Sequence, residues 1–135
     1  MIGRWPIKYK IQGKTYEVAF EIGYYSYYNN NNHNLAIEMV TWMLHESLYM
    51  FTVNISDKSQ KNCAFINTLQ FPEAPEWIEK NGLGKPTGRY GRGENIQYPE
   101  YRFGSDVLTA LDKEGYANYL RQYKVRTKRK EQRER

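Results

Sequence analysis

Residues 7–22 read IKYKIQGKTYEVAFEI, in which apolar side chains recur at every second position. Ile7, Tyr9 and Ile11 alternate with polar residues, and the same alternation resumes at Tyr16. A period of two indicates a half-exposed β-strand, because successive side chains of a strand point to opposite faces. Gly13 lies between the two runs, and glycine accepts the positive φ of a tight turn. The stretch therefore predicts a β-hairpin with one apolar face.

The residues that follow this hairpin predict more strands. Residues 23–34 contain four Tyr and five Asn, and they predict a long loop, because a run of Asn favours turns. Residues 35–42 are apolar on both faces and predict a central strand, with a further strand over residues 48–55. The short apolar run 63–66 predicts a fifth strand. The expected core includes Trp42, Phe51, Trp77 and Leu120.

The second half of the chain predicts helices. A Pro-Glu-Ala-Pro run at residues 72–75 opens a short helix, which ends at Asn81-Gly82. Another short helix is expected over residues 105–111. A third begins at Asp112, because four large side chains follow it at helical spacing. They are Tyr116, Tyr119, Leu120 and Tyr123.

Two segments between these helices are interpreted from Gly and Pro. Residues 83–95 are rich in Gly and contain one Pro, so they predict a loop. Residues 96–103 predict an edge strand, because Pro99 has no N–H to donate in a central one. The expected fold class is α+β: a small antiparallel β-sheet of about five strands, two or three short helices mainly on one face, and a basic C-terminal tail.

The chain has 135 residues, which suits one domain. We expect residues 1–125 to form that domain and residues 126–135 to form a flexible or helical extension. Apolar residues make up 40 % and charged residues 26 % of the chain, which excludes a membrane span and a typical disordered chain. No apolar run approaches the roughly 20 residues of a transmembrane helix, and none at the N-terminus predicts a secretion signal.

The net charge of +5 is distributed unevenly. Residues 121–135 contain eight Lys or Arg and two Glu, a net of +6. The other 120 residues contain twelve basic and thirteen acidic side chains, a net of −1. The basic character therefore belongs to the tail, and the body is nearly neutral.

Residues that carry catalytic chemistry are few. His33 and His45 have no Cys, His or carboxylate at a metal-ligand spacing. Cys63, the one cysteine, begins an apolar run and predicts a small buried side chain in a reducing, cytoplasmic setting. The Gly-rich residues 82–93 lack the Lys-Ser/Thr pair of a phosphate-binding P-loop. We predict no catalytic residue, no metal and no cofactor.

Five phrases occur here in a recognisable order: Asn34-Leu35-Ala36-Ile37, Thr52-Val53-Asn54-Ile55, Asn62-Cys63-Ala64-Phe65-Ile66-Asn67-Thr68, Asn81-Gly82-Leu83-Gly84-Lys85-Pro86-Thr87-Gly88, and Tyr98-Pro99-Glu100-Tyr101-Arg102-Phe103. Their order and spacing resemble a family of small bacterial proteins, the domain of unknown function numbered 4313, over about residues 14–103. The resemblance implies carriage on plasmids, integrative elements and phages, and it implies no catalytic residue. The chain departs from the family pattern at residues 67–69 and 92–94.

The first functional hypothesis is a non-enzymatic role in binding another protein. The Tyr- and Asn-rich loop has the composition of a recognition surface, because Tyr gives a large contact area at low entropy cost. With the mobile-element carriage that the resemblance implies, this predicts a stoichiometric inhibitor of a bacterial defence system, such as an anti-CRISPR protein. It would block a host protein or ribonucleoprotein complex. The residues expected to bind are Tyr24, Tyr25, Tyr27, Tyr28 and Asn30.

The second hypothesis is a DNA- or RNA-binding accessory protein, because a basic tail neutralises phosphates. The residues expected to bind are Arg89 and Arg92 in the Gly-rich segment and Arg126, Lys128, Arg129 and Lys130 in the tail. The third is an enzyme, which requires carboxylates such as Glu38, Glu46 and Asp57 to converge on folding. No membrane partner is predicted.

Overall fold

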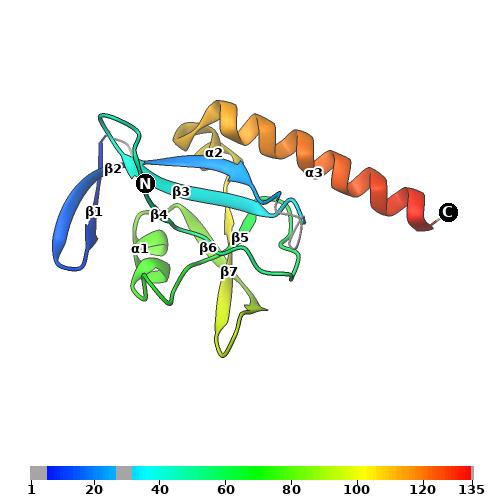
Figure 1. Ribbon diagram of the computed structural model, residues 1–135, viewed down its shortest axis with the longest axis horizontal. Helices are drawn as coiled ribbons and strands as arrows, with labels where there is room; N and C mark the ends of the chain where they lie inside the picture. Colours follow the sequence, from blue (N-terminus) through cyan, green and yellow to red (C-terminus); the bar gives the residue numbers. More distant parts are fainter. Residues whose placement is uncertain (1–5, 27–31, 135) are drawn as a thin grey trace.

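The computed structural model describes residues 6–26 and 32–134, with side chains up to residue 125. The described residues form two antiparallel sheets and three helices, which confirms the α+β class (Figure 1). The strands are divided between a four-stranded and a three-stranded sheet rather than gathered in one. In Figure 1, β2 and β3 run across the direction of β7.

The four-stranded sheet has the order β1-β2-β3-β4 and contains the predicted hairpin. Its strands are β1 (Ile7–Ile11), β2 (Lys14–Tyr24), β3 (Leu35–Thr41) and β4 (Ser47–Met50). The turn residues Gln12 and Gly13 both have positive φ, 50° and 81°, which matches the right-handed twist of a two-residue hairpin. The apolar face of the hairpin is buried, with Tyr9 opposite Tyr16 and Phe20 opposite Met39.

The fourth strand is shorter than predicted, because the chain changes partners after Phe51. The Phe51 N–H still donates to the Ile37 carbonyl of β3. Thr52 then forms an isolated bridge with Ile66, and the Val53 N–H donates to the Phe65 carbonyl. This segment therefore links the two sheets instead of extending β4.

The three-stranded sheet has the order β5-β7-β6 and corrects two predictions. Its strands are β5 (Cys63–Phe65), β6 (Gly84–Arg92) and β7 (Gln97–Phe103). The expected loop is mostly strand β6, and the expected edge strand β7 lies in the centre. Proline is tolerated at position 99 because the pairing of β5 with β7 ends at Glu100. The N–H that Pro99 lacks would lie just beyond this pairing.

Close packing accounts for two glycines of β6. A Cβ on Gly84 would lie 2.6 Å from the Arg102 carbonyl oxygen, and one on Gly91 would lie 2.3 Å from Ile55 Cδ1. Real Cβ atoms essentially never make contacts this short, so a Cβ at Gly84 would displace the β7 backbone and one at Gly91 would displace the Ile55 and Phe65 side chains. The Gly content of this segment therefore reflects packing of a strand rather than a loop.

The helices are α1 (Ala74–Lys80), α2 (Ser105–Leu111) and α3 (Lys113–Glu134). Two Tyr–Glu hydrogen bonds, both 2.7 Å, hold α1 to the sheets: the Tyr9 hydroxyl donates to Glu73 and the Tyr101 hydroxyl donates to Glu79. The third helix has 22 residues and is not short. Its backbone continues through residues 126–134, so this part of the expected tail is helical.

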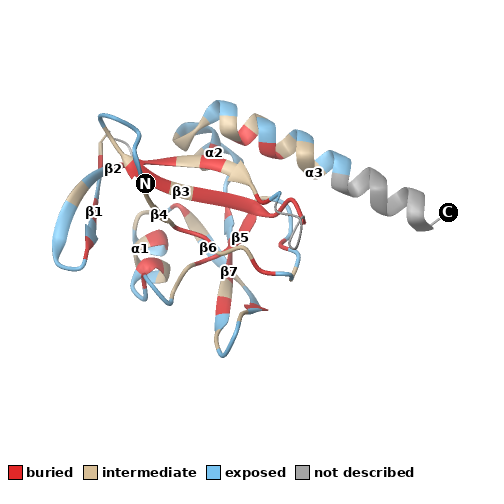
Figure 2. Ribbon diagram, in the orientation of Figure 1, coloured by how far each residue is buried: buried red, intermediate tan, exposed pale blue. Residues whose placement is uncertain are grey.

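The larger of two hydrophobic clusters among the described residues joins the two sheets and the helices, and Ile55, Phe65 and Tyr98 form the smaller one. Figure 2 shows buried residues along most of β3. Phe51 is a core residue as predicted, and Trp77 and Leu120 are partly buried against the core. Trp42 is only half-buried, which corrects its expected place, because the chain is already turning out of β3 at that residue.

Candidate nucleic-acid interface

The base of α3 is fixed to the body by polar contacts. Asp112 caps the helix by accepting a hydrogen bond from the Gly115 N–H at 3.1 Å, and it also accepts one from the Ile22 N–H of β2 at 3.0 Å. The Tyr119 hydroxyl accepts from the Asn62 N–H, and the Tyr116 hydroxyl donates to the Asn62 side chain, both at 2.9 Å. These bonds orient α3 against β2 and against the loop that precedes β5.

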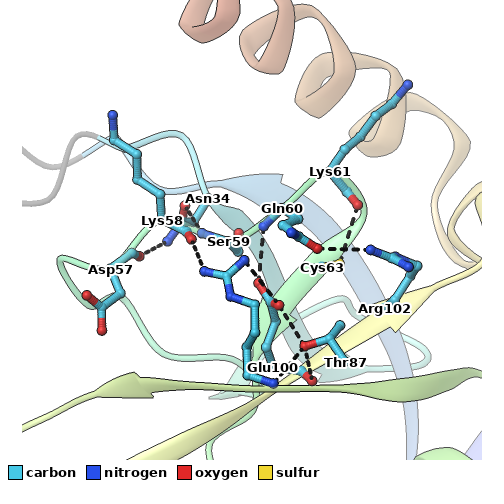
Figure 3. A network of polar contacts seen from close by, with 11 residues as sticks. Asn34, Asp57, Lys58, Ser59, Gln60, Lys61, Cys63, Thr87, Glu100 and Arg102 are labelled. Atoms are coloured by element: carbon cyan, nitrogen blue, oxygen red, sulfur yellow. Dashed lines mark hydrogen bonds and ion pairs between the residues drawn. The ribbon is translucent and has the colours of Figure 1, made fainter.

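A fully buried carboxylate, that of Glu100, lies at the centre of the polar network in Figure 3. It accepts hydrogen bonds from the Gln60 N–H at 3.1 Å and from the Thr87 hydroxyl at 2.8 Å. Arg89 Nη1 lies 3.5 Å from Glu100 Oε1, and Arg89 Nη2 donates to the Lys58 carbonyl at 3.2 Å. A buried charge needs such a partner, so Arg89 compensates Glu100 within the fold.

Cys63 lies beside this network and is buried, as predicted. Its thiol donates to the Lys61 carbonyl at 3.4 Å. Burial raises the pKa of the Cys63 thiol, and the negative charge of Glu100 adds to this effect, while Arg102 opposes it. A protonated, buried thiol is a poor nucleophile, so Cys63 acts as a small core side chain.

The residues expected to bind a protein are only partly on the surface. Tyr25 is 6 % exposed, and its hydroxyl shares a 2.8 Å hydrogen bond with the Thr52 hydroxyl, so the prediction of an exposed anchor is wrong for it. Tyr24 is half-buried at the end of β2, and its ring meets His33 edge-on at 5.7 Å. Tyr27, Tyr28 and Asn30 lie outside the described residues.

Asn residues at the end of this loop have structural roles that the sequence did not reveal. The Asn32 amide donates to the Ile55 carbonyl at 2.7 Å, and the Asn34 amide donates to the Asp57 carbonyl at 2.8 Å. Both side chains are buried, because their amides satisfy backbone groups that have no partner in a sheet. The segment predicted as a long loop therefore ends with two Asn side chains that lie in the interior.

The residues expected to bind nucleic acid differ in their environment. Arg89 is held by Glu100, whereas the Arg92 side chain is exposed and its backbone N–H donates to Asp57 at 2.7 Å. The other four belong to the last part of α3, where the backbone is helical and the side chains lie outside the description. They are Arg126, Lys128, Arg129 and Lys130.

Two of the three carboxylates proposed for an enzyme have separate partners. Glu38 accepts a hydrogen bond from the Ser47 hydroxyl, and Asp57 accepts one from the Arg92 N–H. Glu46 lies in the exposed turn before β4. Among the side chains described, those of residues 6–26 and 32–125, no group of three or more His, Cys, Asp or Glu is placed to hold a metal ion.

Sequence comparison identifies the family. Residues 21–123 match the family model described as Domain of unknown function (DUF4313), and the chain belongs to this family. The match includes both tyrosines that anchor α3 and ends just before the most basic part of the helix. No curated protein and no solved structure matches the chain. Within the described part of the chain, no helix is long and apolar enough to cross a membrane.

Proposed function

We propose that this protein is a non-enzymatic nucleic-acid-binding protein that uses the basic end of α3 as an electrostatic arm. The observation that carries the proposal is the continuity of α3. The helix is fixed at Asp112, Tyr116 and Tyr119 and continues as one element to Glu134. The last fifteen residues of the chain carry a net charge of +6, while the rest carries −1.

A helix of 22 residues is about 33 Å long at 1.5 Å per residue. Figure 1 shows α3 continuing beyond the two sheets toward the C-terminus. Arg126, Lys130 and Arg133 recur in the sequence at spacings of four and three residues. Such a helix fits the major groove of duplex DNA or follows a phosphate backbone, and its cations release condensed counterions on binding.

The test replaces Arg126, Lys128, Arg129 and Lys130 by Gln in the full chain, which lowers the net charge from +5 to +1 and keeps good helix formers. Binding of labelled duplex DNA and single-stranded RNA is titrated at several salt concentrations. We expect the slope of log K against log salt to lose about 3 to 4 on duplex DNA, and binding at physiological salt to fall below detection.

Polyglutamate competition and a melting curve serve as controls for this test. The variant should have the same melting temperature as the unsubstituted protein. Its four substitutions lie C-terminal to Tyr116 and Tyr119, which fix α3 to the body. Equal nucleic-acid binding by the variant and the unsubstituted protein would refute the proposal that the basic end of α3 binds nucleic acid. Competition by polyglutamate as strong as that by nucleic acid would show a general polyanion binder.

A second candidate function is the blocking of a host protein, as expected of a mobile-element or phage-encoded defence inhibitor acting in the cytoplasm. A cleft of about 800 Å³ beside Tyr24 favours it. Glu21, Glu38 and Glu94 line this cleft, and its described lining includes no Lys or Arg. Such a cleft suits a basic surface of the kind that holds nucleic acid in a ribonucleoprotein complex.

A pull-down from a defence-competent bacterial lysate tests this candidate. Glu21 and Glu38 lie directly opposite each other on β2 and β3, so replacing both by Gln removes a repulsion and should not destabilise the sheet. We expect a protein captured by the full chain to be lost with Glu21→Gln/Glu38→Gln and kept with Glu114→Gln, a change in the first turn of α3. Equal capture by both variants would count against the cleft.

A further inference from the structure

We propose that the exposed end of the three-stranded sheet, together with the turn before β5, is a second phosphate-contacting surface, formed by Lys61, Lys85 and Arg102. This inference rests on the proposed nucleic-acid role and extends it from α3 onto the body of the protein. The chemistry that it recognises is the phosphodiester backbone.

Strand register places two of these cations side by side. Arg102 of the central strand β7 lies opposite Cys63 of β5 on one side and opposite Lys85 of β6 on the other. Residues directly opposite each other in a sheet project from the same face, and like charges in such a pair repel. An anion shared between the Lys85 ammonium and the Arg102 guanidinium would turn this repulsion into attraction.

The three cations are exposed, and none of them has an ion-pair partner among the described residues. Within the described part of the chain, no carboxylate oxygen lies within 4.0 Å of Lys61, Lys85 or Arg102, whereas Arg89 is paired with Glu100. Arg102 Nη2 donates to the Gln60 side-chain oxygen at 2.9 Å, which fixes the guanidinium on this face. A guanidinium held in this way has further N–H groups for a phosphate.

The surface has a hollow that suits a small number of phosphates. Lys85 and Arg102 line a pocket of about 1030 Å³ between the end of the sheet and the start of α2. Glu79 and Asp106 line it as well, and Glu79 is bonded to the Tyr101 hydroxyl. The lining therefore has two cations and two carboxylates, a formal charge of zero, and we expect one or two phosphate contacts rather than a long track.

The surface is adjacent to the base of α3. Asn62, which bonds to Tyr116 and Tyr119 of that helix, directly follows Lys61 in the chain. Figure 3 shows Lys61, Cys63 and Arg102 next to one another at one end of the polar network. A strand bound along α3 would therefore meet these cations where the helix joins the body.

The test compares two variants of the full chain that lose the same charge. Lys61→Gln/Lys85→Gln changes the proposed surface. Lys8→Gln/Lys10→Gln changes two exposed lysines of β1, which lies at the opposite end of the molecule from the end of α3 (Figure 1). We expect the first pair to lower the salt slope by about 0.9 to 1.8 on duplex DNA or about 0.7 to 1.4 on single-stranded RNA, and the second pair to leave it unchanged. The nucleic acid that shows the loss identifies the source of the phosphates.

The outcomes separate this inference from the proposed function. Equal slopes for the two pairs would overturn the second surface. If both slopes fall, net charge alone explains the binding, and if neither falls, Lys61 and Lys85 contact no phosphate. The arm would still stand if Gln substitution in α3 abolished binding. Melting temperatures check folding, and Lys85→Gln should not lower stability, since it removes a like-charge pair.

Discussion

Replacing Phe51 with Ala is expected to lower the free energy of unfolding by about 3–5 kcal/mol, which corresponds to roughly 10–20 °C in melting temperature. Phe51 is 2 % exposed and lies where the chain crosses from the four-stranded to the three-stranded sheet. Its ring centroid is 5.3 Å from that of Phe20 and 5.8 Å from that of Tyr9, both in edge-on arrangements. The cavity left by Ala would therefore open in the middle of an aromatic cluster.

Thermal and denaturant unfolding measure this effect. Phe51→Leu keeps most of the volume and should cost less than about 1.5 kcal/mol. Leu69→Ala is a surface control, because Leu69 is 70 % exposed, and it should stay within about 0.5 kcal/mol of the natural chain. If Phe51→Ala were no more harmful than Phe51→Leu, this aromatic cluster would not be the centre of the core.

The second large effect is expected for Arg89→Ala, which should destabilise the fold by about 2–3 kcal/mol. The variant leaves the fully buried Glu100 carboxylate without its cation, since the Gln60 N–H and the Thr87 hydroxyl supply only hydrogen bonds. This loss of unfolding free energy is smaller than that expected for breaking a fully buried ion pair, because the Arg89 side chain is 45 % exposed. Arg92→Ala is the matched control and should have little effect on stability.

A double-mutant cycle with Glu100→Gln isolates the ion pair. A Gln amide can accept from the Gln60 N–H and donate to the Thr87 hydroxyl without a buried charge. Arg89→Ala should therefore cost about 1 kcal/mol or less in the Glu100→Gln background. An equal cost in both backgrounds would mean that Arg89 stabilises the fold through its bond to the Lys58 carbonyl instead.

The parts of the fold that the sequence predicted have local causes. The hairpin β1–β2 follows from alternation over neighbouring residues and from a Gly in its turn. Helix α1 follows from its Pro-rich start and its Asn-Gly end. In contrast, β6 looked like a loop because Gly and Pro have low β-propensity, and only its pairing with β7 makes it a strand.

The site was harder to predict than the fold, because the environment of a side chain depends on distant residues. Arg89 in a Gly-rich segment resembled a free nucleic-acid contact, but Glu100, eleven positions away, holds it. The sequence predicted Tyr25 as an exposed residue that binds a partner, but its hydroxyl is hydrogen-bonded to that of Thr52. The role of Asn62 in fixing α3 could not be predicted from the sequence, because its two tyrosine partners lie more than fifty residues further along the chain.

The sequence by itself determined the α+β class, the hairpin, the apolar stripe of α3 and the concentration of positive charge at its end, because periodicity and charge are local properties of the chain. Only the tertiary structure decided that the strands form two sheets, that Glu100 is buried with Arg89, and that Lys85 lies beside Arg102. Each of these depends on the pairing of segments far apart in sequence. Register and burial are fixed when such segments pack, so no single segment encodes them.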